Sequence, residues 1–222
     1  MQRFIKILAL IAGVFSAATV FAQAKTNLFV ASGPTAGVYY PLGGGLADVL
    51  TKYLPSVNAT AGTTDGSMAN LLLMGQGKAD IGFSMADASW DAYKGQGKFQ
   101  GKPVNARVLM VLYPNRMHVV TVEGTGITKM SDLKGKRVST GAPNSATQIM
   151  AYRVLEAYGI DPEKDIIRER LDPGKSADAI KDKKLDAFFW VGGVPTPAVT
   201  DLGATPGLKL KLIDHAEATD AM

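Results

Sequence analysis

Short apolar runs alternate with longer amphipathic stretches along the chain after residue 24. Apolar runs bounded by Gly, Pro, Asn or Asp are typical of buried strands, whereas apolar residues spaced three or four apart indicate one face of a helix. The runs predict strands at residues 27–31, 57–61, 79–84, 107–113, 118–122, 137–140, 166–171, 187–190 and 209–213. The amphipathic stretches predict helices at residues 40–53, 66–74, 85–93, 146–158 and 176–181, and a short helix after Pro195.

Strands that alternate with helices in this way indicate crossover connections, a largely parallel sheet and therefore a protein of the α/β class. The loop at residues 123–136 interrupts the alternation, and we place a change of domain just before it, near residues 113–117. This divides the chain into a first α/β lobe at residues 25–114 and a second α/β lobe at residues 115–214. Each is of a size at which a domain can fold as a unit.

The end of the chain does not follow this pattern. The last apolar run stops before Asp214, and the remaining HAEATDAM carries no capping or terminating signal. Two lobes that share a cleft are expected to end with a segment that returns to the first lobe. We therefore expect the chain to be truncated at its C-terminus, with residues 215–222 as the start of a missing return segment.

The N-terminus has the features of a secretory signal peptide. Arg3 and Lys6 precede an apolar run at residues 7–21, and Ala22-Gln23-Ala24 follows as a cleavage site. The run is shorter than the roughly 20 apolar residues that a membrane-spanning helix needs. We expect residues 1–24 to be removed after Ala24 or Ala22, which leaves a protein in the periplasm that is not embedded in the membrane.

Charge and composition narrow the possible functions. Loss of Arg3 and Lys6 with the signal peptide leaves 22 basic and 20 acidic residues, a balance that gives no electrostatic footprint for nucleic acid. The chain has no cysteine and only two histidines, His118 and His215, which lie far apart in the sequence. A thiolate or histidine metal site is therefore not expected, and no cofactor is predicted.

The stretch TAGVYYPLGGGLADVL, which follows the first predicted strand, is the first candidate for a binding site. In an open parallel sheet, ligands lie beyond the carboxyl ends of the strands, where the N–H groups at helix N-termini attract anions. Gly37 allows close approach of the backbone, and Tyr39 and Tyr40 supply aromatic walls with hydroxyl groups. Three glycines at residues 43–45 lower helix propensity, which indicates tight packing or close approach of a ligand.

Small polar side chains recur at the other turns from strand to helix. TTDGS at residues 63–67 precedes a helix that carries Asn70, Ser84 and Asp87 follow the next strand, and GAPNSAT at residues 141–147 precedes a later helix. Thr64 or Asp65 also suits a simple helix cap. Together the turns predict a pocket wall made of N–H and hydroxyl donors.

The sequence carries no recognisable catalytic motif. The phosphate-binding loop G-x-x-x-x-G-K-[ST] and the nucleophile elbow G-x-S-x-G are both absent, and the carboxylates are not paired for acid–base chemistry. The residues therefore favour a binding protein. An exported α/β enzyme and a periplasmic sensor domain that recognises a small anionic metabolite stay open as alternatives.

Four segments, taken in order, resemble one family: TAGVYYPLGGGLADVL, AGTTDGSMANLLLMGQGKADIGFSMAD, TKMSDLKGKRVSTGAPNSAT and DAFFWVGGVPTPAV. They are similar to the TAXI branch of the solute-binding proteins of tripartite ATP-independent periplasmic (TRAP) transporters, and the resemblance covers the chain from Lys25 onward. It implies the type II periplasmic binding protein fold, with two α/β lobes around a ligand cleft. It also implies a small organic anion as ligand, an amino acid such as glutamate or another carboxylate, and a TRAP-type membrane permease as partner.

The resemblance also implies the positions of the ligand contacts. These are Gly37, Val38, Tyr39, Tyr40, Thr64, Ser67, Asn70, Ser84, Asp87, Pro143, Asn144, Ser145, Thr147 and Trp190. Two features depart from the family. Its members commonly have glycine where this chain has Asn144, and they continue for roughly another hundred residues, in keeping with the usual size of two lobes.

We predict that the exported protein begins at Lys25 or nearby, because the A-x-A site ends at Ala24. N-terminal sequencing of periplasmic material measures this directly. A periplasmic protein that still begins at Met1 would contradict the prediction.

Overall fold

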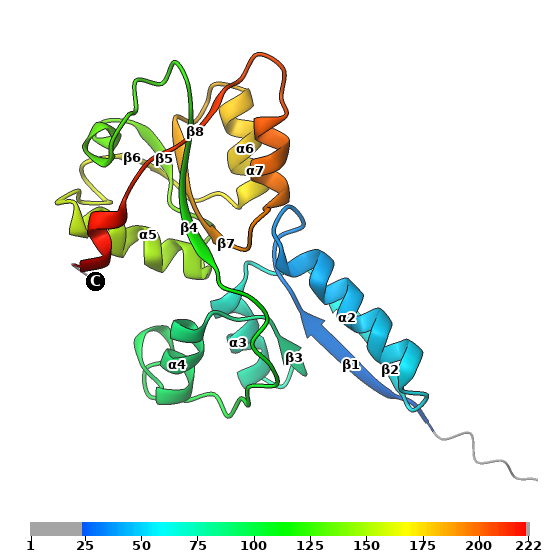
Figure 1. Cartoon of the computed structure of the whole chain (residues 1–222). Helices are drawn as coiled ribbons and strands as arrows, with labels where there is room; N and C mark the ends of the chain where they lie inside the picture. The colour runs from blue at the N-terminus through cyan, green and yellow to red at the C-terminus, as the bar shows by residue number, and fades with distance from the viewer. Residues whose placement is uncertain (1–23, 221–222) are drawn as a thin grey trace, which may run out of the picture.

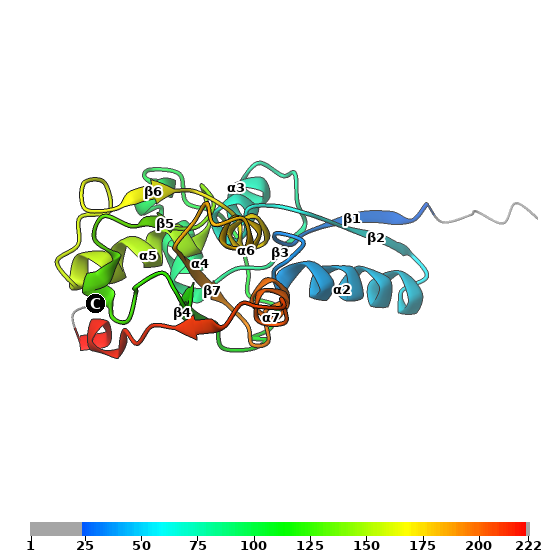
Figure 2. The same cartoon turned by 90° about the horizontal axis from the view of Figure 1, so that it is seen from above.

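The computed structural model describes residues 24–220 (Figure 1). The expected signal peptide lies outside the described residues except for Ala24, and residues 221–222 lie outside them as well. The described chain forms two separate sheets. We call the part built on the N-terminal sheet the first lobe and the part built on the other sheet the second lobe. The two ends of the described chain lie at opposite ends of the molecule (Figures 1 and 2).

The first lobe contains a three-stranded parallel sheet in the order β2-β1-β3. Its strands are β1 (Thr26–Ala31), β2 (Val57–Gly62) and β3 (Ile81–Gly82). Its helices are α2 (Tyr39–Tyr53), α3 (Ser67–Gly75), α4 (Ala86–Lys94) and the short 3-10 helix η1 (Gly97–Phe99). Val30, Ala47 and Phe83 form the core between the sheet and α2, and a second apolar cluster joins α3, α4 and η1.

The second lobe contains a five-stranded sheet in the order β6-β5-β7-β4-β8. Its strands are β4 (Arg116–Val122), β5 (Arg137–Ser139), β6 (Ile167–Glu169), β7 (Ala187–Gly192) and β8 (Leu210–Leu212). Its helices are α5 (Ala146–Ala157), α6 (Pro173–Lys181) and α7 (Pro197–Gly203), with short 3-10 helices η2 (Met130–Leu133) and η3 (Ala216–Asp220). Within residues 24–220 no helix is both long enough and apolar enough to span a bilayer.

The second lobe has three layers, with α5 on one face of its sheet and α6 and α7 on the other, and the central strand β7 reflects this arrangement. Every residue of its sequence AFFWVG is buried, as expected for a strand that is covered on both faces. Successive side chains point to opposite faces of a sheet, so Phe189 packs with the α5 side of the core and Phe188 packs with α6 and α7. β7 lies between β5 and β4, and Trp190 near its end lies against the backbone of the first lobe at Gly37.

Most of the predicted elements are confirmed, with boundaries shifted by a few residues, and so is the α/β class. Two predictions are wrong. β4 runs antiparallel to both β7 and β8, so the second sheet is mixed rather than largely parallel. The predicted strand at residues 107–113 is absent, and this segment is an extended connection without regular structure. A strand needs a hydrogen-bonded neighbour, and among the described residues no strand pairs with this segment. Its side chains are not covered either, since Val108 is 80% exposed and Val111 is 91% exposed.

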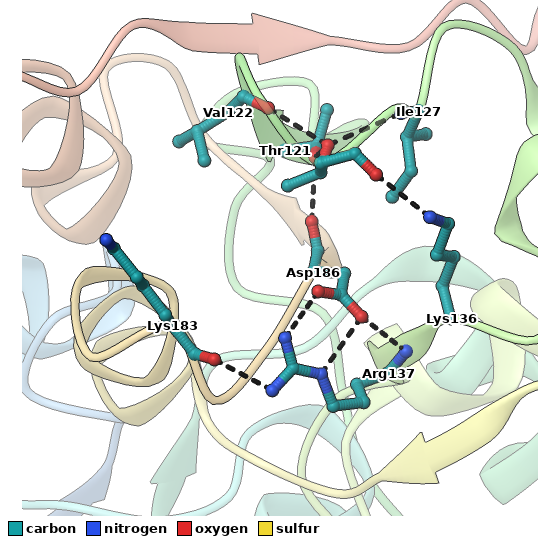
Figure 3. A network of polar contacts seen from close by, with 8 residues as sticks. Thr121, Val122, Ile127, Lys136, Arg137, Lys183 and Asp186 are labelled. Atoms are coloured by element: carbon teal, nitrogen blue, oxygen red, sulfur yellow. Dashed lines mark hydrogen bonds and ion pairs between the residues drawn. The ribbon is translucent and has the colours of Figure 1, made fainter.

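An ion pair fixes the strands of the second lobe to one another (Figure 3). Asp186, just before β7, accepts hydrogen bonds from Nε and Nη2 of Arg137 at 3.0 and 2.6 Å, and also from the Arg137 backbone N–H at 2.8 Å. The backbone carbonyl of Asp186 accepts the hydroxyl of Thr121 on β4 at 2.7 Å. Hydrogen bonds from Arg137 hold the pKa of the Asp186 carboxyl below its ordinary value. The pair therefore links β5, β7 and β4 at one edge of the lobe.

We expect Asp186→Ala to lower the free energy of unfolding at pH 7 by about 1.5–3 kcal/mol, the usual worth of hydrogen bonds to a charged group. Because the folded-state pKa is depressed, this stabilisation is complete above the ordinary aspartate pKa of about 3.9 and is lost as the pH falls through the folded-state value. Denaturant unfolding as a function of pH measures it. The matched control is Asp178→Ala, which removes an exposed carboxylate from the surface of α6 and should change stability little. Equal losses in the two variants at pH 7 would contradict the prediction.

Candidate functional site

A small cavity of about 30 Å³ lies between the two lobes. Seven of the residues predicted as ligand contacts line it: Gly37, Val38, Tyr39, Ser67, Ser145, Thr147 and Trp190. The remaining lining residues were not predicted: Pro34, Asp65, Gly66, Met85, Tyr113, Ala146, Val191 and Gly192. Both lobes thus contribute to one site, which is built from the turns that follow β1, β2 and β5 and from the end of β7.

The turn between β1 and α2 forms the first wall. The N–H of Gly37 donates to the carbonyl of Pro34 at 2.9 Å, which closes the turn. A Cβ at Gly37 would stand 3.2 Å from Cη2 of Trp190, so the glycine lets the indole of the second lobe lie directly against the backbone of the first. A Cβ at Gly43 would stand 2.8 Å from Cβ of Ser32, which explains this glycine by packing of α2 on β1.

The two adjacent tyrosines have different positions. Tyr39 lines the cavity, and its ring centroid lies 5.3 Å from that of Phe83. Its hydroxyl accepts a hydrogen bond from Nδ2 of Asn115 at 3.1 Å, so its own proton is available to another acceptor. Burial raises the pKa of Tyr39 above its ordinary value. Tyr40 is 40% exposed and does not line the cavity.

The turn between β2 and α3 forms the second wall. Gly66 has φ 109° and ψ −150°, a backbone conformation that is essentially restricted to glycine. It brings Ser67, the first residue of α3, into the wall, where the Ser67 hydroxyl accepts the N–H of Met85 at 3.1 Å.

Two residues predicted beside this turn lie behind the wall rather than in it. The amide of Asn70 is completely buried and donates to the carbonyls of Ser32 and Phe83, both at 2.7 Å. The hydroxyl of Thr64 donates to Oδ1 of Asn70 at 2.6 Å. These side chains hold the carboxyl ends of β1 and β3 together, and their predicted contact with a ligand stays a prediction.

The turn between β5 and α5 forms the third wall. The Ser145 hydroxyl caps α5 by accepting the N–H of Gln148 at 3.2 Å, and it donates to the carbonyl of Ala142 at 2.7 Å. The Thr147 hydroxyl accepts the N–H of Val191 at 3.2 Å and so fixes α5 to β7. Pro143, in the same turn, is exposed and lies outside the cavity lining.

Asn144 contacts the first lobe instead of the cavity. Its φ of 61° lies in the left-handed region, which Asn and Gly tolerate better than other residues, so Asn and Gly are both suited to this position. Its carbonyl accepts the N–H of Ala69 at 3.2 Å, and its side-chain oxygen accepts Nζ of Lys98 at 2.8 Å.

Asp87 also bridges the two lobes. One carboxylate oxygen lies 3.5 Å from Nη1 of Arg153 on α5, and the other is buried without a hydrogen-bond partner among the described residues. Ser84, in the connection between β3 and α4, donates to the carbonyl of Met85 at 3.0 Å. Neither residue is part of the cavity lining.

The electrostatic character of the cavity comes from backbone groups. The helices α2, α3 and α5 all begin at its wall, with Tyr39, Ser67 and Ala146 as their first residues. Among the described residues, no side chain caps the N-terminus of α2 or α3. In α3 the N–H of Ala69 donates to the carbonyl of Asn144, which leaves the N–H groups of Ser67 and Met68 available. Asp65 is the single charged side chain of the lining, and no Lys, Arg or His is part of it. The arrangement suits a small anion that is held by N–H and hydroxyl donors.

Tyr113 is the residue of the lining that sequence reasoning missed most clearly. It lies on the connection between the lobes, which the apolar pattern predicted as a strand. Its position just before the predicted change of lobe was a usable signal, since the connections between two lobes border the cleft that the lobes form.

Comparisons with known proteins agree with this architecture. A model of the NMT1-like family matches residues 30–221. Among solved structures, the alkanesulfonate-binding protein of Xanthomonas axonopodis pv. citri bound to MOPS is 17% identical, with a TM-score of 0.57 over 88% of this chain and 63% of that chain. A binding protein component of an ABC phosphonate transporter from Pseudomonas aeruginosa is 15% identical, with a TM-score of 0.57 over 86% of this chain and 65% of that chain. An ancestral arginine-binding protein bound to arginine is 15% identical, with a TM-score of 0.55 over 84% and 78%.

These similarities show the fold, which is that of the periplasmic substrate-binding proteins. The chain spans about 63% of the length of the alkanesulfonate-binding protein that it matches.

We expect Asn144→Ala to destabilise the protein by about 1–2 kcal/mol, because an alanine at this left-handed position carries the steric cost of its Cβ. Asn144→Gly should be destabilised much less, since glycine adopts the conformation freely and keeps the backbone bond to Ala69. Both variants lose the contact with Lys98, so the comparison isolates the backbone. Chemical denaturation of the three proteins measures the difference, and equal stability of the two variants would contradict it.

Proposed function

The chain belongs to the NMT1-like family, and on this premise we propose that it is a periplasmic receptor for a small organic anion, which it delivers to a membrane transporter. The observation that carries the proposal is the cavity between the lobes, where two helix N-termini without side-chain caps meet hydroxyl groups from both lobes. N–H and hydroxyl donors in a largely buried site stabilise a carboxylate, sulfonate or phosphonate group without a basic side chain.

Closure of the lobes is the expected mechanism. Polar contacts already join them: Ala69 and Lys98 bond to Asn144, and the N–H of Ala198 donates to the carbonyl of Ala36 at 3.1 Å. A cavity of about 30 Å³ has room for little more than water. A ligand the size of an amino acid therefore needs a wider cleft on entry, so binding would shift an equilibrium between open and closed forms.

The sequence segments that resemble the TAXI branch favour a carboxylate such as glutamate as ligand and a TRAP-type permease as partner. The similar proteins have different ligands and systems. The Xanthomonas protein is bound to MOPS, and the ancestral protein is bound to arginine. The Pseudomonas protein is a component of an ABC phosphonate transporter. We favour a carboxylate because of the resemblance to the TAXI branch.

An exported enzyme is the second candidate class, and a periplasmic sensor domain is the third. Against an enzyme stands the chemistry of the lining, in which the Ser67, Ser145 and Thr147 hydroxyls bond to backbone groups and no histidine lies beside them. His118 pairs with Trp190 across β4 and β7 and is not part of the lining. Recovery of the bound molecule unchanged after incubation separates a receptor from an enzyme.

The proposal is tested by calorimetric titration with glutamate, succinate, ethanesulfonate and methylphosphonate. Tyr39→Phe should weaken the binding of the ligand by about tenfold to a hundredfold, because it removes a hydrogen bond to a charged group worth about 1.5–3 kcal/mol. Tyr40→Phe is the matched control, since Tyr40 lies outside the cavity, and should bind like the parent. The proposal fails if the parent binds none of these anions, or if Tyr39→Phe and Tyr40→Phe bind equally tightly.

A further inference from the structure

Tyr113 has a buried hydroxyl without a hydrogen-bond partner among the described residues, although the residue lines the cavity. Buried tyrosine hydroxyls usually have a partner, because desolvation without a replacement bond is costly. An unsatisfied hydroxyl on a residue that lines a binding cavity therefore points to a partner that is supplied by the bound molecule.

The ring of Tyr113 is held from both lobes. A Cβ at Gly193 would stand 2.7 Å from Cε2 of Tyr113, so the ring lies directly against the backbone that follows β7. In the first lobe, the ring centroid of Tyr39 lies 6.5 Å from that of Tyr113. Neighbours from both lobes therefore hold the Tyr113 ring at the edge of the cavity.

The neighbouring polar groups do not satisfy the hydroxyl. Asn115 directs its Nδ2 to the Tyr39 hydroxyl at 3.1 Å, and its Oδ1 is buried without a partner among the described residues. Tyr39, Tyr113 and Asn115 therefore form a cluster at the connection between the lobes with unused hydrogen-bonding capacity. Burial raises the pKa of Tyr113 far above its ordinary value, so the hydroxyl stays a neutral donor at physiological pH.

We infer that the hydroxyl of Tyr113 donates a hydrogen bond to the bound molecule and so selects ligands that carry a second acceptor group besides the anionic group held at the helix N-termini. The inference rests on the proposed function and refines its ligand class. The favoured ligands are dicarboxylates and amino acids with a polar side chain, whereas acids with a purely aliphatic remainder leave the Tyr113 hydroxyl without a partner. Leaving a buried donor unpaired is the usual way in which a site rejects an analogue that lacks the matching group.

The test uses two matched pairs of probes, which are glutamate with norvaline and succinate with butyrate. Each pair has the same number of carbon atoms, and its second member lacks one carboxylate. Calorimetric titration of the parent should show tighter binding of glutamate than of norvaline, or of succinate than of butyrate. Tyr113→Phe should lose about tenfold to a hundredfold in affinity for the member with two carboxylates and change its affinity for the other member little.

A second measurement separates ligand contact from a structural role. Because Tyr113→Phe keeps the ring and removes an unpaired buried hydroxyl, the ligand-free variant should melt at the same temperature as the parent or higher. Tyr93→Phe, at an exposed position on α4, is the control and should behave like the parent in both measurements.

If Tyr113→Phe binds glutamate and succinate as tightly as the parent, the inference is wrong while the proposed function stands. If the parent binds ethanesulfonate or methylphosphonate but neither glutamate nor succinate, the inference is wrong and the proposed function stands; if it binds none of the four anions, both are wrong. A lower melting temperature for ligand-free Tyr113→Phe would also overturn the inference, because it would show that the hydroxyl has a partner within the protein.

Discussion

Helices that begin at the wall of a cavity must find acceptors for the N–H groups of their first turns, and this constraint governs the structure between the two lobes. α5 meets it partly with its own residue, because the Ser145 hydroxyl accepts the N–H of Gln148. α2 and α3 begin with Val38 and Gly66 at their N-cap positions, and within the described chain no side chain caps them. Neither N-cap residue offers a side-chain acceptor, so N–H groups at both helix starts are left for a ligand, and this is the feature from which an anion site follows.

The contact between the lobes depends on the same turns. Asn144 lies in the turn before α5, and its carbonyl and side chain bind the first lobe at Ala69 and Lys98. Gly37 lies in the turn before α2 and allows Trp190 of the second lobe to approach the backbone. The residues that present donors to a ligand are thus neighbours of the residues that join the lobes. A ligand in the cavity would therefore affect closure through direct contacts.

Local signals in the sequence were sufficient for much of the fold, and they also singled out seven residues that line the cavity between the lobes. Each predicted strand-to-helix turn exists, because apolar periodicity and Gly, Pro and Ser at the turns act over a few residues. The prediction of a strand at residues 107–113 was wrong, because strand formation depends on a distant pairing partner, which an apolar pattern does not reveal. Asn70 and Ser67 look equivalent in the sequence, yet Asn70 is turned toward Ser32 and Phe83 while Ser67 lines the cavity. Tyr113 was missed for a similar reason, since its place in the cavity depends on how the two lobes meet.

The central claim is that a small anion binds between the lobes and favours their closed arrangement. The chain contains no cysteine, so single cysteines introduced at Lys52 on α2 and at Lys184 after α6 can carry spin labels without competing sites. The distance distribution between the labels should be broad, with more than one population, in the ligand-free protein. Saturating glutamate should convert it to a single narrow population. An unchanged distribution at a glutamate concentration that saturates the protein by calorimetry would contradict the account.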